Sequence, residues 1–172
     1  MASELRVDRI IPVNGVPTGG GGGIIQVVSA STSTEVTNAT TSYVDTGLTA
    51  TITPTSASSK VFVMITQQFS YTIVSDIQGI GIRIYRDTTL VYDPITNATG
   101  PFEDYVALGN VTSVTRRGTF NRSILDSPNT TSAVTYKTQG RPYRSVGSGT
   151  AVFQPSNIVN GTSIINLIEV SG

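Results

Sequence analysis

The chain has 172 residues with 11 basic and 11 acidic side chains, and it contains no cysteine and no histidine. These absences exclude disulfides, thiolate metal sites, cysteine nucleophiles and serine–histidine–aspartate catalysis from this chain. Charged residues make up only 13% of the sequence, which is about half the usual share. The length favours one domain of ordinary size.

Residues that favour strands dominate the composition. There are 26 threonines, 19 serines, 19 valines and 17 isoleucines, but only 6 leucines and 9 alanines. Val, Ile and Thr are stiff at χ1 and suit a pleated surface, whereas Leu and Ala favour helices. The composition therefore predicts an all-β protein. It has no apolar run of about 18 residues, so no membrane-spanning segment is predicted. The first residues lack the pattern of a signal peptide, so we expect synthesis in a cytosol.

Residues 1–18 predict an N-terminal arm that needs something to dock on. Charged and apolar residues alternate from Glu4 to Asp8, which is the period of a half-exposed strand. Pro12 and Pro17 interrupt hydrogen-bonded pairing, so any pairing is partial or at a sheet edge. The arm is too short to form a core of its own, so we expect it to dock on its own domain or on a partner. The candidate anchoring residues are Leu5, Val7, Ile10, Ile11, Val13 and Val16.

Five consecutive glycines follow the arm, at positions Gly19, Gly20, Gly21, Gly22 and Gly23. Such a run has no side chains to pack, and it reaches about 17 Å when fully extended. We interpret it as a flexible hinge; close packing of backbones near a symmetry axis is the alternative. A phosphate-binding loop would need a following helix, but the next residues predict a strand.

From residue 24 onward the sequence predicts strands and turns. The predicted strands cover residues 24–30, 43–53, 60–65, 80–92 as a hairpin, 106–108, 111–115, 132–138 and 163–170. Residues 61–65 are apolar at every position, which predicts a central strand or one covered by another subunit. About eight strands without helices predict an antiparallel β-sandwich, of jelly-roll type, over residues 24–172. The extended arm (1–18) and the hinge (19–23) precede it.

No catalytic or metal-binding pattern is visible in the sequence. Glu103 and Asp104 are adjacent, so on a strand they would point to opposite faces and could not share a substrate. Asp87 and Asp93 flank the predicted hairpin as turn residues. The sequence also lacks a calcium-binding loop of the EF-hand type. We therefore predict a non-enzymatic protein with no catalytic residues, no metal site and no cofactor.

The net charge of zero conceals an uneven distribution. Residues 1–110 carry 5 basic and 9 acidic side chains, whereas residues 111–172 carry 6 and 2. One interpretation is ion pairing between the halves, within or between subunits; the others are an anionic sugar or protein partner and nucleic acid. Because the whole chain is neutral, we do not expect it to bind nucleic acid. The candidate subunit-interface or ligand surface comprises Arg116, Arg117, Arg122, Tyr136, Arg141, Tyr143 and Arg144.

A family resemblance rests on several stretches spread along the chain, which are residues 5–12 (Leu-Arg-Val-Asp-Arg-Ile-Ile-Pro), 15–18 with the glycine run into 24–27, 41–48, 51–54, 58–61, 84–87 and 163–170. These stretches resemble small virion structural proteins of tailed bacteriophages, particularly marine ones. The resemblance implies a short virion-binding N-terminal segment, a glycine hinge and a jelly-roll-like head, usually as a homotrimer. The similar proteins include head decorations, head fibres and tail fibres. Residues 116–160 match nothing in them that we can place.

These observations lead to competing hypotheses. The first is a capsid decoration or short head fibre, located in the virion, assembled in the bacterial cytoplasm and bound to itself and to a capsid or tail protein. The second is a tail-fibre or receptor-binding module that recognises a host surface glycan through its arginines and tyrosines. The third, a carboxylate-dependent glycan depolymerase, is the least favoured. No membrane partner is expected.

Overall fold

Alternating burial explains why the chain folds as sheets. In β3 (Val44–Ile52) and β11 (Ser163–Val170), buried side chains alternate with more exposed ones along most of the strand, as expected for strands with one face toward a core. The computed structural model describes residues 23–73, 77–93, 104–107, 114–144, 149–156 and 161–172. The arm and Gly19–Gly22 lie outside these residues.

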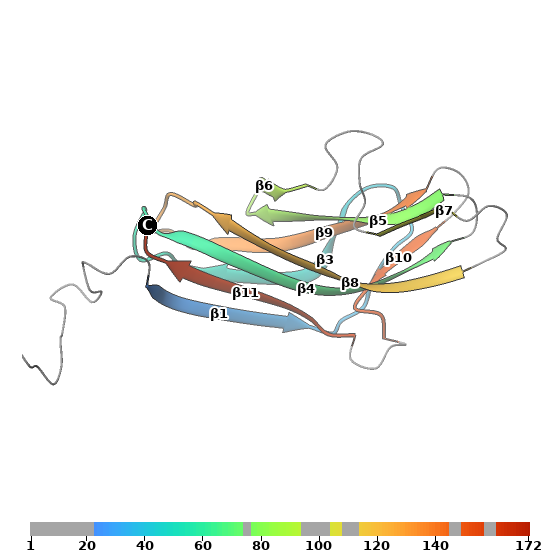
Figure 1. Cartoon of the computed structure of the whole chain (residues 1–172), viewed down its shortest axis with the longest axis horizontal. Coiled ribbons are helices and arrows are strands. Elements are labelled where there is room, and N and C mark those ends of the chain that lie inside the picture. Colours follow the sequence, from blue (N-terminus) through green and yellow to red (C-terminus); the bar gives the residue numbers. More distant parts are fainter. Residues whose placement is uncertain (1–22, 74–76, 94–103, 108–113, 145–148, 157–160) are drawn as a thin grey trace, which may run out of the picture.

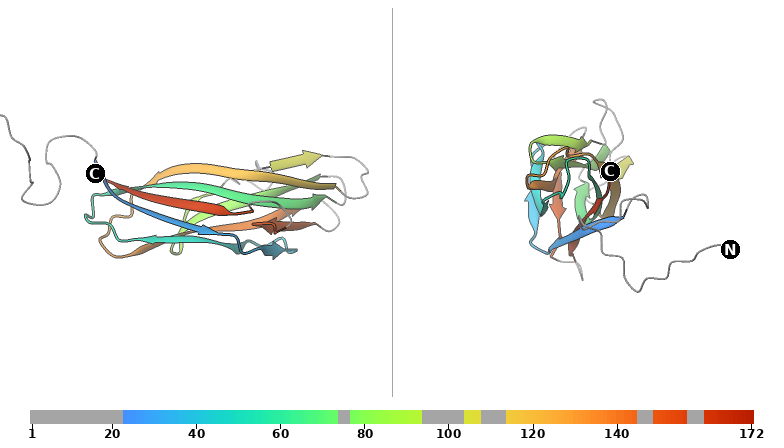
Figure 2. Two further views of the ribbon diagram at one scale, coloured as in Figure 1. Left: turned by 90° about the horizontal axis from the view of Figure 1, so that it is seen from below. Right: turned by 90° about the vertical axis from the view of Figure 1, so that its left-hand side faces the viewer.

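The described residues form two antiparallel sheets packed face to face (Figure 1). Sheet A contains β1 (Ile24–Thr32), β2 (Val36–Asn38), β4 (Lys60–Ile73), β8 (Val114–Asp126), β10 (Thr150–Phe153) and β11. Sheet B contains β3, β5 (Ile77–Arg86), β6 (Thr89–Tyr92), β7 (Asp104–Ala107) and β9 (Val134–Arg144). Figure 2 shows the strands of both sheets running along the long axis of the molecule.

The strand order confirms the predicted jelly-roll-type sandwich. In sheet A, β4 pairs with β8 on one side and with β11, then β10, on the other, and β11 in turn pairs with β1. In sheet B the order is β3-β9-β5, with β6 and β7 both paired to β5. The first long strand therefore lies beside the last, as in a double-sheet jelly roll.

The chain enters and leaves the sandwich at the same end, which we call the N-terminal pole. Ile24 is in register with Val170, which is in register with Lys60 on its other side. The Ser171 N–H donates to the Gly23 carbonyl at 3.2 Å. The C-terminus and the start of β1 lie together in Figures 1 and 2. The end of β4 and the start of β8 lie at the opposite pole.

Aliphatic and aromatic side chains from both sheets fill the space between them. Phe69, Tyr71 and Phe153 are among the buried core residues. The Phe153 ring lies directly over Gly140 in β9, where a Cβ atom would clash with the ring. The two sheets therefore approach closely at this point because position 140 carries no side chain.

Most predicted strands are confirmed, and the differences concern their lengths. The predicted strand 60–65 extends to residue 73. Residues 114–115 of the predicted strand 111–115 begin β8, which runs to residue 126, and residues 111–113 lie outside the described residues. Many positions of β8 are occupied by Arg, Thr, Asn and Ser. The sequence therefore lacks the apolar alternation that would predict this strand. The short strands β2 and β10 lie outside the predicted set. The hairpin over 80–92 is confirmed, with Asp87 at a φ of 50° in its turn.

Candidate interaction surfaces

The outer face of sheet B carries a cluster of one tyrosine and two arginines. The Arg83 guanidinium lies 3.8 Å from the centre of the Tyr43 ring, and that of Arg141 lies 4.9 Å from it. Such cation–π contacts stabilise a guanidinium against an aromatic ring. Arg83 is also ion-paired with Asp93 at 3.0 Å. Burial raises the pKa of Tyr43, although the two nearby guanidiniums oppose the shift, so the phenol stays neutral at ordinary pH.

Strand register positions the two arginines of this cluster, and hydrogen bonds of a buried asparagine position its tyrosine. Arg141 is opposite Gly81, so Arg83 lies two residues further along the same face of β5. Asn38 is buried; its side-chain amide donates to the carbonyls of Ser42 and Gly140, and its oxygen accepts from Thr40. These bonds fix the turn that leads into Tyr43.

A second polar group continues along the same outer face. Asp45 accepts hydrogen bonds from Lys137 at 2.9 Å and from Gln139 at 2.7 Å. Burial raises the pKa of Asp45, but the hydrogen bonds and the charge of Lys137 lower it more, so the net pKa is below its ordinary value. Lys137 comes from the basic half of the chain and Asp45 from the acidic half, which agrees with ion pairing between the halves. Both side chains are partly exposed, so the pair contributes little stability.

The structure divides the predicted interface surface between the two sheets. Arg116, Arg117 and Arg122 lie on β8 in sheet A, whereas the predicted residues from 136 to 144 lie on β9 in sheet B. Register places Arg116 opposite Tyr71 near the far end of β4, and Tyr143 opposite Gly79 near the start of β5. Apart from residues 122 and 136, the predicted set therefore gathers toward the end of the sandwich opposite the N-terminal pole.

Tyr136 was predicted to lie on that surface, and the structure corrects this prediction. Its side chain is buried in the core rather than displayed, because even-numbered positions from 134 to 142 of β9 face inward. The Tyr136 hydroxyl donates to Asp126 at 2.6 Å, and Arg86 donates to the same carboxylate oxygen at 2.5 Å. Burial and the Asp126 carboxylate raise the pKa of Tyr136 strongly. This network joins β5 and β9 of sheet B to β8 of sheet A.

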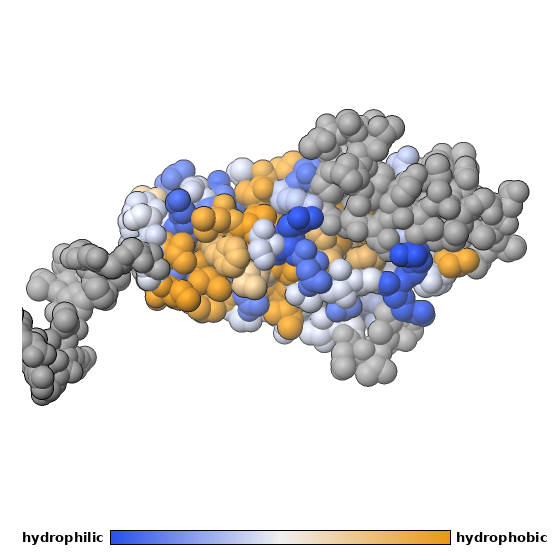
Figure 3. Space-filling view, in the orientation of Figure 1, coloured by the Kyte–Doolittle hydropathy of each residue, from blue (hydrophilic) through white to orange (hydrophobic). Residues whose placement is uncertain are grey.

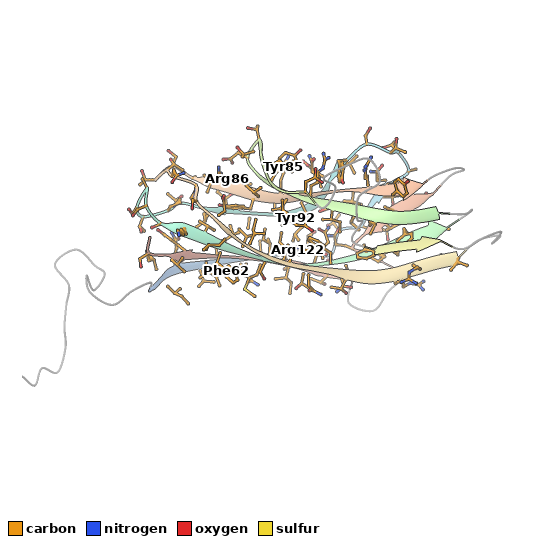
Figure 4. The ribbon with its side chains drawn as sticks, turned by 45° about the horizontal axis from the view of Figure 1, so that its top comes forward. Phe62, Tyr85, Arg86, Tyr92 and Arg122 are labelled. Carbon is orange, nitrogen blue, oxygen red and sulfur yellow. The ribbon has the colours of Figure 1, made fainter. Side chains whose placement is uncertain are left out.

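Arg122 also contributes to the fold, because its side chain lies between β6 and β8 at one side of the sandwich. Its guanidinium lies 4.6 Å from the centre of the Tyr92 ring and 5.9 Å from that of Phe120. Figure 4 shows Arg122 and Tyr92 close together between the two sheets. The contact bridges β8 and β6, which belong to different sheets.

A buried carboxylate lies at the N-terminal pole. Glu169 accepts hydrogen bonds from the Gln26 side chain and from the backbone N–H and hydroxyl of Thr55. Burial raises the pKa of Glu169, but the hydrogen bonds from Gln26 and Thr55 lower it more, so the net pKa lies below its ordinary value. These bonds tie β1, β11 and the turn before β4 together. No sequence signal marks this site, because its donors come from distant segments.

The outer face of sheet A is apolar near the N-terminal pole, as the space-filling view shows (Figure 3). Val61, Val63 and Ile65 of β4 face the core, and Met64 is exposed on the other side. The prediction that this strand is central is confirmed, because β8 and β11 flank it. Whether another subunit covers its outer side stays a prediction.

The remaining predicted sites fall partly outside the described residues. The six anchoring residues and four of the five hinge glycines lie there, and Gly23 has open space around its Cβ position. Within the described ranges, no group of three or more acidic side chains is arranged to hold a metal ion. The part of the chain that the structure describes contains no helix able to cross a membrane.

Of the comparisons with known proteins, the one with solved structures found similar proteins. No protein-family model matches the chain, and no curated protein matches it. The "Crystal structure of infectious bursal disease virus VP2 subviral particle" is similar at 12% identity and a TM-score of 0.40, over 86% of this chain and 40% of that chain. The "Structure of infectious bursal disease virus Gt strain" is similar at 14% identity and a TM-score of 0.38, over 84% and 40%. This chain thus spans about two-fifths of the length of those chains.

Proposed function

We propose that this protein is a non-enzymatic structural component of a bacteriophage virion. In this proposal residues 1–18 attach it to a capsid or tail protein, the glycines 19–23 act as a hinge, and the sandwich projects as a head. A capsid decoration or short head fibre is the form we favour, because the described residues form a sandwich without a fibrous shaft. The homotrimer implied by the sequence resemblance belongs to the same proposal.

The position of the chain entry is the observation that carries this proposal. Gly23 lies at one pole beside the C-terminus, so an apolar arm joined there through glycines can bind a particle while the sandwich points away from it. The opposite pole, with the starts of β5 and β8, would then face outward. An apolar segment with alternating residues is suited to strand addition or to a hydrophobic groove on its partner.

Particle incorporation tests this assignment. A chain lacking residues 1–18 should stay folded but fail to join particles when it is supplied during infection in place of the full chain. A matched variant is the full chain with Ile10 and Ile11 changed to Ser, which keeps the length but removes two candidate anchors and should lower incorporation. Normal incorporation of the truncated chain would contradict anchoring by the arm.

A receptor-binding module is the second candidate function, because arginines and a tyrosine gather toward the outward pole. Arg117 lies on the outer side of β8 and Arg141 on the outer face of sheet B. In this alternative, Arg117→Ala or Arg141→Ala should weaken adsorption of purified protein to host cells at least several-fold. Lys60→Ala, which removes a basic residue at the other pole, is the control. Equal adsorption by all three variants would remove this candidate.

A further inference from the structure

A row of four apolar residues runs in register across the outer face of sheet A. Val27 in β1 is opposite Ile168 in β11, Ile168 is opposite Phe62 in β4, and Phe62 is opposite Leu125 in β8. None of the four is a buried core residue. Figure 4 labels Phe62 on β4. The row therefore crosses four neighbouring strands without a polar interruption.

Further apolar residues flank this row on the same face. We call the whole set the sheet A patch: Ile24, Val27, Phe62, Met64, Leu125, Ile164, Ile168 and Val170. Among the described residues, five of the seven large hydrophobic side chains that are exposed belong to it. Ile24, Val27 and Leu125 are 68%, 58% and 57% exposed. Monomers rarely display such contiguous apolar surface without a use for it.

Among the described residues of this face, no charged side chain lies between Lys60 and Arg117. The next two rows along the strands contain only Ser, Asn, Met, Thr and Ile side chains, and Gln68 with Thr119 follow. Lys60 at one end and Arg117 at the other are its charged residues. A nucleic acid or a strongly charged protein would find no complementary charge between them. A second copy of the same face meets no like-charge repulsion there.

The dimensions of the face suit an interface between subunits. β4 and β8 pair over 13 positions, which is about 43 Å at about 3.3 Å per residue. Toward the N-terminal pole the face is four strands wide, and toward the other pole β10 and β2 take the places of β11 and β1. At about 4.8 Å per strand this width is about 19 Å. The whole outer face therefore measures about 800 Å², which matches one side of a standard-size protein interface. The sheet A patch lies within the seven positions at which β11 pairs with β4, so it fills about half of this face.

We infer that the sheet A patch is the surface through which a second copy of this chain binds. The inference rests on the proposed structural function and names the contact that would hold the copies together. Sandwiches packed through these faces around a shared axis parallel to their long axes would place their N-terminal poles at the same end. Their arms would then emerge together, which would let one oligomer attach to a particle through several arms and gain avidity.

Cross-linking provides the direct test, because the chain has no native cysteine. Met64→Cys places a thiol inside the patch, and Leu90→Cys in β6 places one on an exposed apolar position of the other sheet. With a flexible bismaleimide and micromolar full-length protein, we expect cross-linked dimers from the Met64→Cys variant and monomers from the Leu90→Cys variant. No dimers from either variant, or equal amounts from both, would overturn the inference.

Charge insertion gives an independent measurement. Leu125→Glu and Val27→Glu should reduce the mass measured by light scattering to that of one chain and leave the head folded, since both side chains are exposed. Leu90→Glu is the matched control and should stay oligomeric. A monomeric unsubstituted chain would overturn the inference.

The competing occupant of the patch is the arm of the same chain, which precedes Ile24. Maleimide labelling of the Met64→Cys variant separates the two occupants. If its new thiol reacts only after residues 1–18 are removed, in a protein that is monomeric throughout, the arm covers the patch and the inference is wrong. All these measurements use purified protein without particles. They therefore separate failure of this contact from failure of the proposed virion function, which only particle incorporation tests.

Discussion

Glu169 shows how a single buried carboxylate can hold one end of the sandwich through uncharged hydrogen-bond donors. Its oxygens accept hydrogen bonds from Gln26 at 2.5 Å and from Thr55 at 2.7 Å. Hydrogen bonds to the charged form stabilise it against the cost of burial. The charged carboxylate therefore organises the turn between β3 and β4 and the first residues of β1.

Glu169→Gln should destabilise the protein in a pH-dependent way. The pKa of Glu169 is lowered in the folded state, so its stabilising effect is full above the unfolded pKa of about 4.3 and is lost as the pH falls through the folded value. We expect a loss of about 1–3 kcal/mol at pH 7. Urea unfolding at pH 7 and at pH 3 checks this, and the difference from the unsubstituted chain should shrink at the lower pH. An equal difference at both pH values would contradict it.

The Arg86–Asp126–Tyr136 network should behave as one coupled unit. Tyr136→Phe leaves the ring in the core but removes the donor to Asp126, and we expect a loss of about 1–2 kcal/mol. Arg86→Met removes the other donor. A double-mutant cycle in urea should give a coupling energy of at least about 0.5 kcal/mol, because both side chains bind the same oxygen. Strict additivity would show that the two contacts are independent.

At the scale of elements, a glycine decides how closely the two sheets approach. Gly140→Ala would drive a methyl group into the Phe153 ring, so the ring or the strand has to move. We expect a destabilisation of about 1–3 kcal/mol, measured by thermal unfolding. Gly140→Ala combined with Phe153→Leu should recover part of it. Gly23→Ala is the matched control with open space and should change the melting temperature little.

Element prediction succeeded where apolar residues are dense and failed where polar residues dominate. The segment 163–170 was predicted with the bounds that the structure has, because Ile, Leu and Val fill most of its positions. The long strand β8 was recognised only at its start, because its exposed positions tolerate Arg, Thr and Asn. The cation–π contact between Arg83 and Tyr43 could not be predicted, because it depends on how distant segments are placed across sheet B.

For the whole molecule, buried side chains between Leu48 and Leu167 fill the described core. Removing residues 1–18 should therefore leave a head that unfolds cooperatively, with a melting temperature within a few degrees of the full chain. Differential scanning calorimetry of the two proteins checks this. A collapse of the transition would mean that the arm belongs to the fold of the head.

Composition and local alternation were enough to establish the all-β class, the sandwich and the lack of histidine- or cysteine-based chemistry. All three depend on each residue and its near neighbours, so they can be predicted from the sequence alone. The burial of Tyr136, the bonds from Gln26 and Thr55 to Glu169, and the apolar row across sheet A emerged only from the folded molecule. Each of these depends on register between strands that are distant in sequence. In this sandwich the first strand pairs with the last, so no local pattern contains that register.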